Sequence, residues 1–408
     1  MKESTQSAAD AGGVVGPDVV AACALSAIPG VGASVMARIT GAFGGFAAAL
    51  EAGPGKILKR ADELQLKQES VEFLSRKPDL EDLGAWAIAA AKGAGARVVV
   101  LGDPWYPPLL RSIDNPPPLL YVRGALDPDV PRIALVGARD ADDYGLQLAR
   151  DIAEGLAMAG VEVVSGGARG IDAAAHAGAL WGQGTTAAVL GCGIDIVYPP
   201  ENAALFDRLS NGGGAVVSEF VPGTPSARQN FPRRNRTISG LASAVVVLRA
   251  TVESGSLLTA NHAAAQGRPI FAVPGKADEP LSAGPNSLLT LNAARAVTSA
   301  RDILLALGWP LPETMGEQRP APRPRKTPPP SQLAHTAEVE AAKSGEILLD
   351  EVSLKVWNLL DERAPLHVDE LAGRANLTVP ETLHRLVELE QKGLCTQRPG
   401  KYFLRRGT

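Results

Sequence analysis

Short, continuously apolar runs alternate with amphipathic stretches between residues 97 and 308 of the chain. Most of these runs end in or just before glycine or serine, and segments with helical spacing at 144–158, 170–180 and 257–266 separate several of them. Strands buried on both faces of a parallel sheet have this pattern. The sequence therefore predicts an α/β fold with a doubly wound, mostly parallel sheet. The predicted strands are RVVVL, RIALVG, VEVVSGG, TAAVLG, AVVSEF, SAVVVL and PIFAVPG.

Residues 20–90 have a helical pattern, because they are rich in alanine and their apolar positions recur at helical spacing. Within them, LSAIPGVGASVMARI, residues 25–39, predicts a helix-hairpin-helix or SAM-like domain with a Pro-Gly-Val-Gly turn. Such a turn can bring backbone N–H groups close to a phosphate. A plain helical corner is an equal alternative, since Arg38 is the only basic residue close by. The polar residues 1–19 are expected to be disordered.

Three helical segments and two short strands are expected in residues 346–408, which is the arrangement of a winged helix. The third helix opens with a capping box of Thr378 and Glu381. It carries Arg385 and Lys392 against three glutamates, so a role in protein interaction or a vestigial role is at least as well supported as duplex binding. Residues 310–345 are rich in proline and basic, which predicts an extended linker.

The composition, the net charge and the spacing of cysteine and histidine exclude several classes of function. With 45% hydrophobic residues, 21% charged residues and a net charge of -4, the chain is globular, and its affinity for a polyanion has to come from local clusters. The three cysteines and five histidines have no metal-ligand spacing, so we expect reduced thiols and no metal site. The polar start and the lack of a long apolar run predict a cytoplasmic protein with no membrane segment.

One basic cluster stands out in this acidic chain: ARQNFPRRNRTISG, residues 227–240. Arginines that surround an aromatic ring are typical of a groove for single-stranded nucleic acid, where the ring stacks on a base and the cations neutralise phosphates. In the alternative, Phe231 and Pro232 plug the sheet edge and the arginines pair with Glu201, Asp207 and Glu219. The candidate nucleic-acid-binding residues here are Arg228, Asn230, Phe231, Arg233, Arg234, Asn235 and Arg236.

Three loops that follow predicted strands combine small residues with a helix start: LVGARDADDYG, VSGGARGIDAAAHAGAL and ATVESGSLLTANHAAAQG. Backbone N–H groups at such positions can bind phosphate, and arginines add neutralising charge. Neither of the glycine-rich nucleotide-binding fingerprints can be written through these loops, so no nucleotide cofactor is predicted. The candidate residues are Arg139, Gly166, Gly167, Arg169, Ser254, Gly255 and Ser256.

Longer motifs carry a resemblance to a known family. SGGARGIDAAAH, AAVLGCGIDIVYPPENAALF, VVSEFVPGTPSARQNFPRRNRTISGLA, ESGSLLTA and GRPIFAVPG occur in this order, and from Asp103 to Asp302 the chain resembles the DNA-processing protein A family (DprA, also called Smf). The resemblance implies an extended Rossmann-like domain over residues 91–309 that binds single-stranded DNA and is not an enzyme. It also implies a homodimer that protects incoming DNA during natural transformation, displaces single-strand-binding protein and loads the RecA recombinase.

The resemblance also assigns roles to individual residues. Arg139 matches the arginine of the family's G-S-R loop and Arg169 the arginine of its A-R-G-I-D motif. Arg228 and Phe231 match a basic residue and a stacking aromatic of its DNA pocket, and Asn235 and Arg236 fall in its F-P-x-R-N-R core.

The chain also departs from the family at four positions. Thr185 and Pro200 stand where the family often has basic residues, and Ala138 and Cys192 replace a serine and a threonine. The loss of two cations weakens binding unless Arg208 and Arg228 compensate.

Two other functions compete with this one. The lysine-decarboxylase-like (LOG) phosphoribohydrolases have a similar sheet, but their glutamate has no equivalent after the threonine in ESGSLLTANHA, where Glu253 lies on the wrong side. A transcription regulator led by the winged helix would instead prefer duplex DNA. The sequence does not decide whether the host takes up DNA, where RecA docks or what the tail binds.

Overall fold

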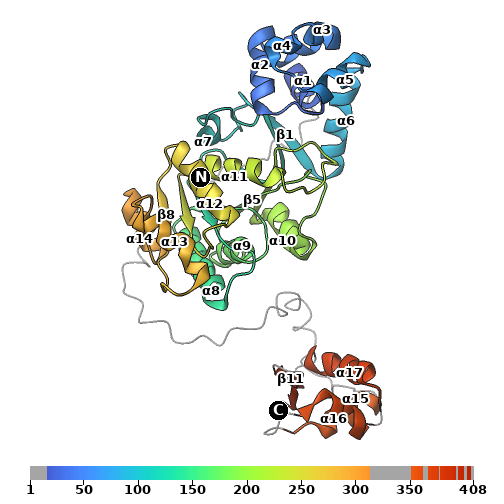
Figure 1. Ribbon diagram of the computed structural model, residues 1–408, viewed down its shortest axis with the longest axis vertical. Coiled ribbons are helices and arrows are strands. Elements are labelled where there is room, and N and C mark those ends of the chain that lie inside the picture. The colour runs from blue at the N-terminus through green and yellow to red at the C-terminus, as the bar shows by residue number, and fades with distance from the viewer. Residues whose placement is uncertain are drawn as a thin grey trace, which may run out of the picture. The chain divides into compact units, whose positions relative to one another are not determined.

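The protein is described by a computed structural model, which covers residues 16–312, 351–361, 366–375, 377–391, 394–398 and 402–405. The chain forms two compact units, residues 1–318 and 319–408 (Figure 1). Most of the segment expected to be disordered, residues 1–15, and the expected linker from residue 313 onwards lie outside the described residues. The predicted domain boundaries stay predictions, although the first helix already begins at Pro17.

A nine-stranded sheet organises the first unit, with the order β1-β2-β6-β5-β4-β3-β7-β8-β9. The pairs from β6 through β9 are parallel, while β2 pairs antiparallel with both β1 and β6. The predicted doubly wound, mostly parallel sheet is confirmed. Its strands are β1 (Ala96–Val100), β2 (Leu119–Gly124), β3 (Arg132–Val136), β4 (Glu162–Ser165), β5 (Thr186–Val189), β6 (Gly214–Ser218), β7 (Ala244–Val247), β8 (Ile270–Ala272) and β9 (Arg295–Ala296).

Helices cover both faces of this sheet, because alternate strand residues point to opposite sides. Ile133 and Leu135 of β3 belong to one core and Ala134 and Val136 to the other. The first core is closed by α8 (Asp143–Met158), α9 (Ile171–Trp181) and α14 (Ala300–Leu307). The second is closed mainly by α7 (Pro108–Arg111), α11 (Asn230–Leu241), α12 (Gly255–Ala265) and α13 (Pro280–Thr290).

The N-terminal helices pack on the antiparallel end of the sheet, next to β1 (Figure 1). They share one core with Ala96, Val100, Leu119 and Tyr121 of β1 and β2, and α10 (Ala203–Arg208) borders that core through Phe206. The predicted pair of helices with a tight turn at residues 27–32 is present. The helices are α1 (Pro17–Ser26), α2 (Ala33–Phe43), α3 (Phe46–Lys59), α4 (Ala61–Leu64), α5 (Gln68–Ser75) and α6 (Leu80–Gly93).

Within the described residues no single helix is long and apolar enough to cross a membrane. The pair α2 and α3 meets that length and composition only jointly, across a bend of 92°.

The second unit is a winged helix, as predicted. In its described residues a three-stranded sheet of order β10-β12-β11 packs with three helices around Val356, Leu371, Leu386 and Phe403. The predicted capping box is present, since Thr378 N donates to Glu381 Oε2 at 2.9 Å and Glu381 N donates to Thr378 Oγ1 at 3.4 Å. The elements are α15 (Glu351–Leu359), β10 (Leu366–His367), α16 (Val368–Ala375), α17 (Val379–Gln391), β11 (Cys395–Arg398) and β12 (Tyr402–Arg405).

Candidate nucleic-acid-binding site

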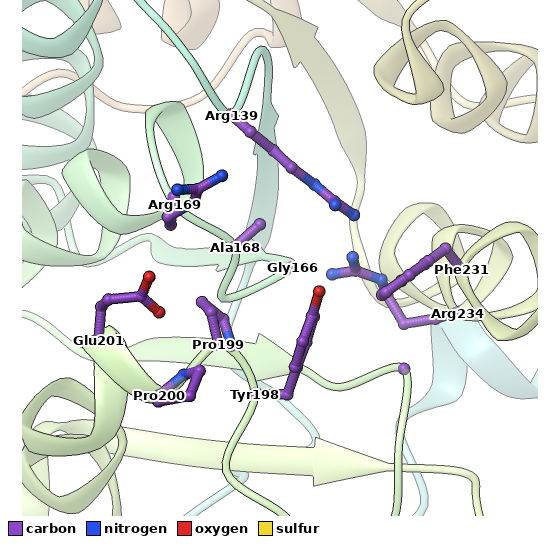
Figure 2. Close-up of a pocket in the computed structure, with 11 residues that line it drawn as sticks. Arg139, Gly166, Ala168, Arg169, Tyr198, Pro199, Pro200, Glu201, Phe231 and Arg234 are labelled. Carbon is purple, nitrogen blue, oxygen red and sulfur yellow. The ribbon is translucent and has the colours of Figure 1, made fainter. Parts of the chain in front are cut away.

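A cavity of about 270 Å³ opens where β3, β4 and β5 end and α11 begins. Ligands of doubly wound sheets bind at such carboxyl ends, next to the strand from which the chain continues to both sides. Here that strand is β3, which lies between β4 and β7. We call this space the aromatic cavity (Figure 2). Its lining residues are Arg139, Gly166, Ala168, Arg169, Gly191, Tyr198, Pro199, Pro200, Glu201, Phe231 and Arg234.

Two aromatic rings form one wall of the aromatic cavity. Phe231 lies in the first turn of α11, and its ring centroid is 6.2 Å from that of Tyr198, with an angle of 35° between the planes. Gly191 makes this position possible, because a Cβ there would lie 2.9 Å from Cδ1 of Phe231. Since Tyr198 is 40% exposed and Phe231 is half-buried, a flat ligand can reach both rings.

Arginines from two elements contact the same ring. The guanidinium carbon of Arg139, in the loop after β3, is 4.9 Å from the Phe231 centroid, and that of Arg234 is 5.7 Å from it. Arg139 is exposed and its side chain extends into the cavity (Figure 2). These distances fit cation–π attraction, which fixes the cations beside the ring without neutralising them.

Arg234 is a buried cation in the cavity wall. Its side chain donates from Nη1 to the carbonyl of Val189 at 3.1 Å, whereas its buried Nε has no hydrogen-bond partner among the described residues. Burial lowers the pKa of Arg234, and the carboxyl of Asp172 opposes that effect. Because Arg234 also lines the aromatic cavity, its charge can stabilise an anion bound there.

The loop after β4 differs from the sequence prediction. Its N–H groups were expected to meet a phosphate, but those of Gly166 and Ala168 donate to Oδ2 of Asp172 at 3.1 and 3.3 Å. The buried carboxylate therefore occupies the position of the anion, although burial raises the pKa of Asp172. Gly166 is required for another reason, since a Cβ there would lie 1.7 Å from Nη1 of Arg234.

The opposite side of the aromatic cavity carries charges of both signs. Arg169 is 55% exposed at its side chain and lies 3.9 Å from Asp140, which is itself almost fully exposed. An ion pair of this kind contributes little and leaves Arg169 able to turn toward a ligand. Glu201 lines the same side (Figure 2). The cavity is therefore polar and basic away from its aromatic wall, with one carboxylate at its edge.

The remaining residues of α11 hold the helix in place. Asn230 donates to the carbonyl of Gly191 at 3.1 Å, and Asn235 donates to that of Gly255 at 3.1 Å. Arg233 pairs with the buried Glu219 at 2.7 Å, as the alternative interpretation of the sequence expected. The expected partners Glu201 and Asp207 form no ion pair with α11 in the described residues, so that alternative applies to Arg233 alone.

Several predicted residues lie outside the aromatic cavity. Ser254 caps α12 by accepting from Ser256 N, and Ser256 Oγ donates to the carbonyl of Gly137 at 2.8 Å, so this loop has a structural role. Gly167 faces Phe206 rather than the opening, and Arg228 is exposed on the connection before α11. The structure thus brings together Arg139, Gly166, Arg169, Phe231 and Arg234, and it does not bring Gly167, Arg228, Asn230, Arg233, Asn235, Arg236, Ser254, Gly255 or Ser256 into the lining.

Two of the four departures from the family pattern, those where a basic residue is replaced, differ in position. Thr185 directly precedes β5, at the amino ends of the strands and away from the cavity, and donates to Glu162 Oε2 at 3.2 Å. A basic residue there would not reach the cavity. Pro200 lines the cavity beside Glu201, so the loss of a cation at this position changes the charge of the site.

Sequence reasoning missed the part of the lining that comes from the connection after β5. Gly191, Tyr198 and Glu201 all belong to it. This connection has no strand or helix period, so no pattern shows where its side chains point. Two signals were available: Gly191, which ends the predicted strand TAAVLG, and Pro200, where the family often has a basic residue.

The absence of a metal site stays a prediction. All three cysteines are buried and unbridged. The described part of the chain holds no group of three or more potential metal ligands.

Known proteins resemble the chain over both units. Residues 97–308 match the family described as DNA recombination-mediator protein A, and residues 322–401 match the DprA winged helix domain. Protein Smf of Escherichia coli is 39% identical over 308 residues, which are 74% of this chain and 76% of that protein. The putative DNA processing protein DprA of Mycobacterium tuberculosis is 36% identical over 353 residues, or 84% and 82% of the two chains. The X-ray structure of DNA processing protein A from Streptococcus pneumoniae gives a TM-score of 0.60 at 29% identity and covers 71% of this chain and 98% of that one.

Proposed function

Because the chain belongs to the DNA-processing protein A (DprA/Smf) family, we propose that it binds single-stranded DNA in the aromatic cavity. One observation carries the proposal: the half-buried ring of Phe231 lines a cavity together with Arg139 and Arg234, whose guanidinium carbons are 4.9 and 5.7 Å from the ring centroid. Every base offers a face that stacks on such a ring, and arginine neutralises the phosphates on either side. Binding of this kind does not depend on sequence.

The geometry favours a single strand over a duplex. The rings of Phe231 and Tyr198 line a confined space, so a base has to leave its stack to contact them. A base of a single strand does so at little cost, whereas a paired base must first be separated from its partner. Most of α11 is buried, and side-chain hydrogen bonds hold it against the connection after β5 and the start of α12, so the helix cannot enter a groove of duplex DNA.

The wider role that we propose is mediation of recombination without nucleotide hydrolysis. The family description supports mediation of recombination. The sequence resemblance further implies a homodimer that protects incoming DNA, displaces single-strand-binding protein and loads RecA during natural transformation. Loading is tested by coating a single strand with single-strand-binding protein and measuring the rate of RecA filament formation with and without this protein. A DNA-processing role also supports the predicted cytoplasmic location.

A nucleotide-cleaving enzyme is the competing proposal, since Glu201 lines the same cavity as two exposed arginines. The loop compared with the catalytic loop of phosphoribohydrolases instead caps α12, and Glu253 is not part of the lining. A phosphoribohydrolase with this sequence would therefore lack the glutamate of its catalytic loop, and Glu201 would have to take over that role.

Fluorescence anisotropy of labelled oligo-dT at several salt concentrations discriminates between these proposals. We expect the logarithm of the binding constant to fall by about 0.7 per contacted phosphate for each tenfold rise in salt concentration. Neither duplex DNA nor a nucleoside monophosphate should displace the strand. Cleavage of a nucleoside monophosphate, together with an absence of single-strand binding, would establish the enzyme instead. Preferential binding of one duplex sequence would favour the transcription regulator.

A further inference from the structure

A second hollow, of about 400 Å³, lies between the hairpin that joins α1 to α2 and the outer side of α11. We call it the hairpin hollow. It is separate from the aromatic cavity, with which it shares no lining residue. Its lining residues are Gly30, Gly32, Ala33, Ser34, Val35, Lys67, Pro232, Arg233, Arg236 and His262.

Cations from two regions of the chain converge on the hairpin hollow. Lys67 precedes α5, and Arg233 and Arg236 belong to α11. Among the described residues Arg236 donates only to carbonyl oxygens, those of Asp114 and Asn115 at 2.7 Å, so no carboxylate there cancels its charge. The lining contains no carboxylate. The hollow therefore has the electrostatic character of an anion site.

Two acidic groups border the hollow. Glu219 pairs with Nε of Arg233 on the sheet side. The other end of that guanidinium faces the hairpin, since a Cβ on Gly32 would lie 3.9 Å from Nη1. Glu69 packs against Gly30 but is not part of the lining. Burial lowers the pKa of His262, which favours the neutral imidazole.

Backbone donors complete the hollow. Gly32 is the N-cap of α2 and supplies no side-chain hydrogen bond to the first turn, whose residues Ala33, Ser34 and Val35 line the hollow. The first N–H groups of a helix have no partner inside the helix, and they bind anions when cations stand nearby. Gly32 itself has an ordinary extended backbone, with φ at -105°, which any residue can adopt. Its lack of a side chain therefore serves to leave room in the hollow.

The two hollows lie on opposite sides of α11. At about 100° per residue, Phe231 and Arg234 point to one side of the helix, and Pro232, Arg233 and Arg236 point to the other. The assignment of these residues to the two linings agrees with that geometry. A helix is about 10–12 Å across with its side chains, so one DNA strand can pass over the exposed Pro232 and reach both hollows.

We propose that the hairpin hollow binds a backbone phosphate of the same DNA strand whose base occupies the aromatic cavity. The inference rests on the proposed function and extends it, because it adds a contact made by the N-terminal helices. Phosphate bound there would be held by Lys67, Arg236 and the first N–H groups of α2. These groups contact the phosphate and not the base, so the contact does not depend on DNA sequence. The helix-hairpin-helix would thus contribute to affinity and to the length of strand that is bound.

The test compares the intact protein with Lys67→Glu and Gly32→Ala. Lys67 is exposed, and a methyl group at Gly32 meets no atom closer than 3.9 Å, so both variants are expected to fold. Lys59→Glu is the matched control, because Lys59 is an exposed lysine of the same N-terminal region outside the hollow. Each protein is titrated with oligo-dT of about 4 and about 16 nucleotides, the limits of common site sizes, at several salt concentrations.

For the longer strand we expect Lys67→Glu to reduce the salt slope by about 0.7, equivalent to one phosphate, while Lys59→Glu leaves it unchanged. Gly32→Ala should weaken binding of the longer strand without removing a charge. Neither change should affect the shorter strand, which the aromatic cavity alone accommodates. Equal slopes for Lys67→Glu and Lys59→Glu would overturn the inference.

Other outcomes separate this inference from the proposed function. If Phe231→Ala weakens binding but Lys67→Glu and Gly32→Ala do not, only the inference fails. If the intact protein binds neither strand, both fail. A loss of affinity for inorganic phosphate in Lys67→Glu, with an unchanged salt slope for the longer strand, would mean that the hollow binds a free anion and not DNA.

Discussion

At the scale of single residues, α11 shows how one short segment serves two purposes. Phe231 and Arg234 face the aromatic cavity, whereas Asn230 and Asn235 donate to backbone carbonyls in the connection after β5 and at the start of α12, which hold the helix in place. Arginines of the same helix also differ in their surroundings: Arg234 is 5% exposed, and the side chain of Arg233 is 36% exposed and paired with Glu219. A count of basic residues therefore overstates the number available to DNA.

Replacement of Phe231 by alanine tests the stacking contact directly. We expect Phe231→Ala to lose about 1–3 kcal/mol of binding free energy for every single-strand sequence, because stacking does not distinguish bases. Fluorescence anisotropy with oligo-dT and a mixed sequence measures the change. Phe231→Tyr is the control, since it keeps the ring and should bind as the unaltered protein does. Equal affinity of the alanine variant and the unaltered protein would remove Phe231 from the site.

Replacement of Gly166 by alanine tests how closely the wall of the cavity is packed. A Cβ would lie 1.7 Å from Nη1 of the buried Arg234, so we expect Gly166→Ala to destabilise the fold by about 1–3 kcal/mol and to displace that guanidinium. Urea unfolding and DNA affinity measure the two effects. Gly255→Ala is the matched control, because a Cβ there meets nothing within 4 Å and should leave stability unchanged or raise it. If Gly166→Ala changed neither the stability nor the DNA affinity, the Arg234 guanidinium would be able to shift without cost.

At the scale of elements, the sequence predicts the sheet far better than the site. The seven apolar runs are all strands, because burial on both faces requires continuous apolar residues. By contrast β2 was not predicted as a strand, and α11 follows no apolar helical pattern at its start. Its Pro232 is tolerated because the first N–H groups of a helix have no partner inside it, and Ile238 and Leu241 supply the packing. Tertiary contacts therefore create this helix, and with it the position of Phe231.

The contact between α9 and β5 predicts a dependence of stability on pH. Thr186 Oγ1 donates to the carbonyl of Val163 at 2.6 Å, so His176 must donate from Nδ1 to that hydroxyl, at 2.7 Å. Its Nε2 is buried and has no partner in the described residues. Burial and, less strongly, the nearby Arg234 lower the pKa of His176 to about 3 from an ordinary 6.5. The folded protein therefore keeps this imidazole neutral where the unfolded chain takes up a proton.

The sign of this effect follows from proton binding. Below about pH 6.5 the unfolded state binds a proton that the folded state does not, so stability is lost as the pH falls toward 3. We expect this group to remove about 2 kcal/mol between about pH 7 and about pH 5. Urea unfolding of the unaltered protein and of His176→Gln at both pH values isolates the contribution. Identical losses in the two proteins would contradict the expected pKa.

At the scale of the whole molecule, the charges are distributed unevenly. The chain as a whole carries a net charge of -4, but both hollows along α11 are lined by cations. All residues of both hollows belong to the first compact unit, and the winged helix has a core of its own. In its third helix Arg385 pairs with Glu388 at 3.0 Å, so that helix presents little positive charge. DNA binding should therefore reside in the first unit.

Removal of residues 319–408 tests this division. Since the cavity, the hairpin hollow and the three cores around the sheet all lie before residue 318, we expect the shortened chain to fold and to keep its affinity and salt slope for oligo-dT. The urea unfolding curve of the shortened chain shows whether the sheet is intact, and anisotropy titration measures the binding. The separate winged helix should bind oligo-dT weakly, because its acidic third helix repels phosphate. If the shortened chain folds but loses affinity, the second unit supplies phosphate contacts of its own, and the proposed path of the strand would have to extend beyond α11.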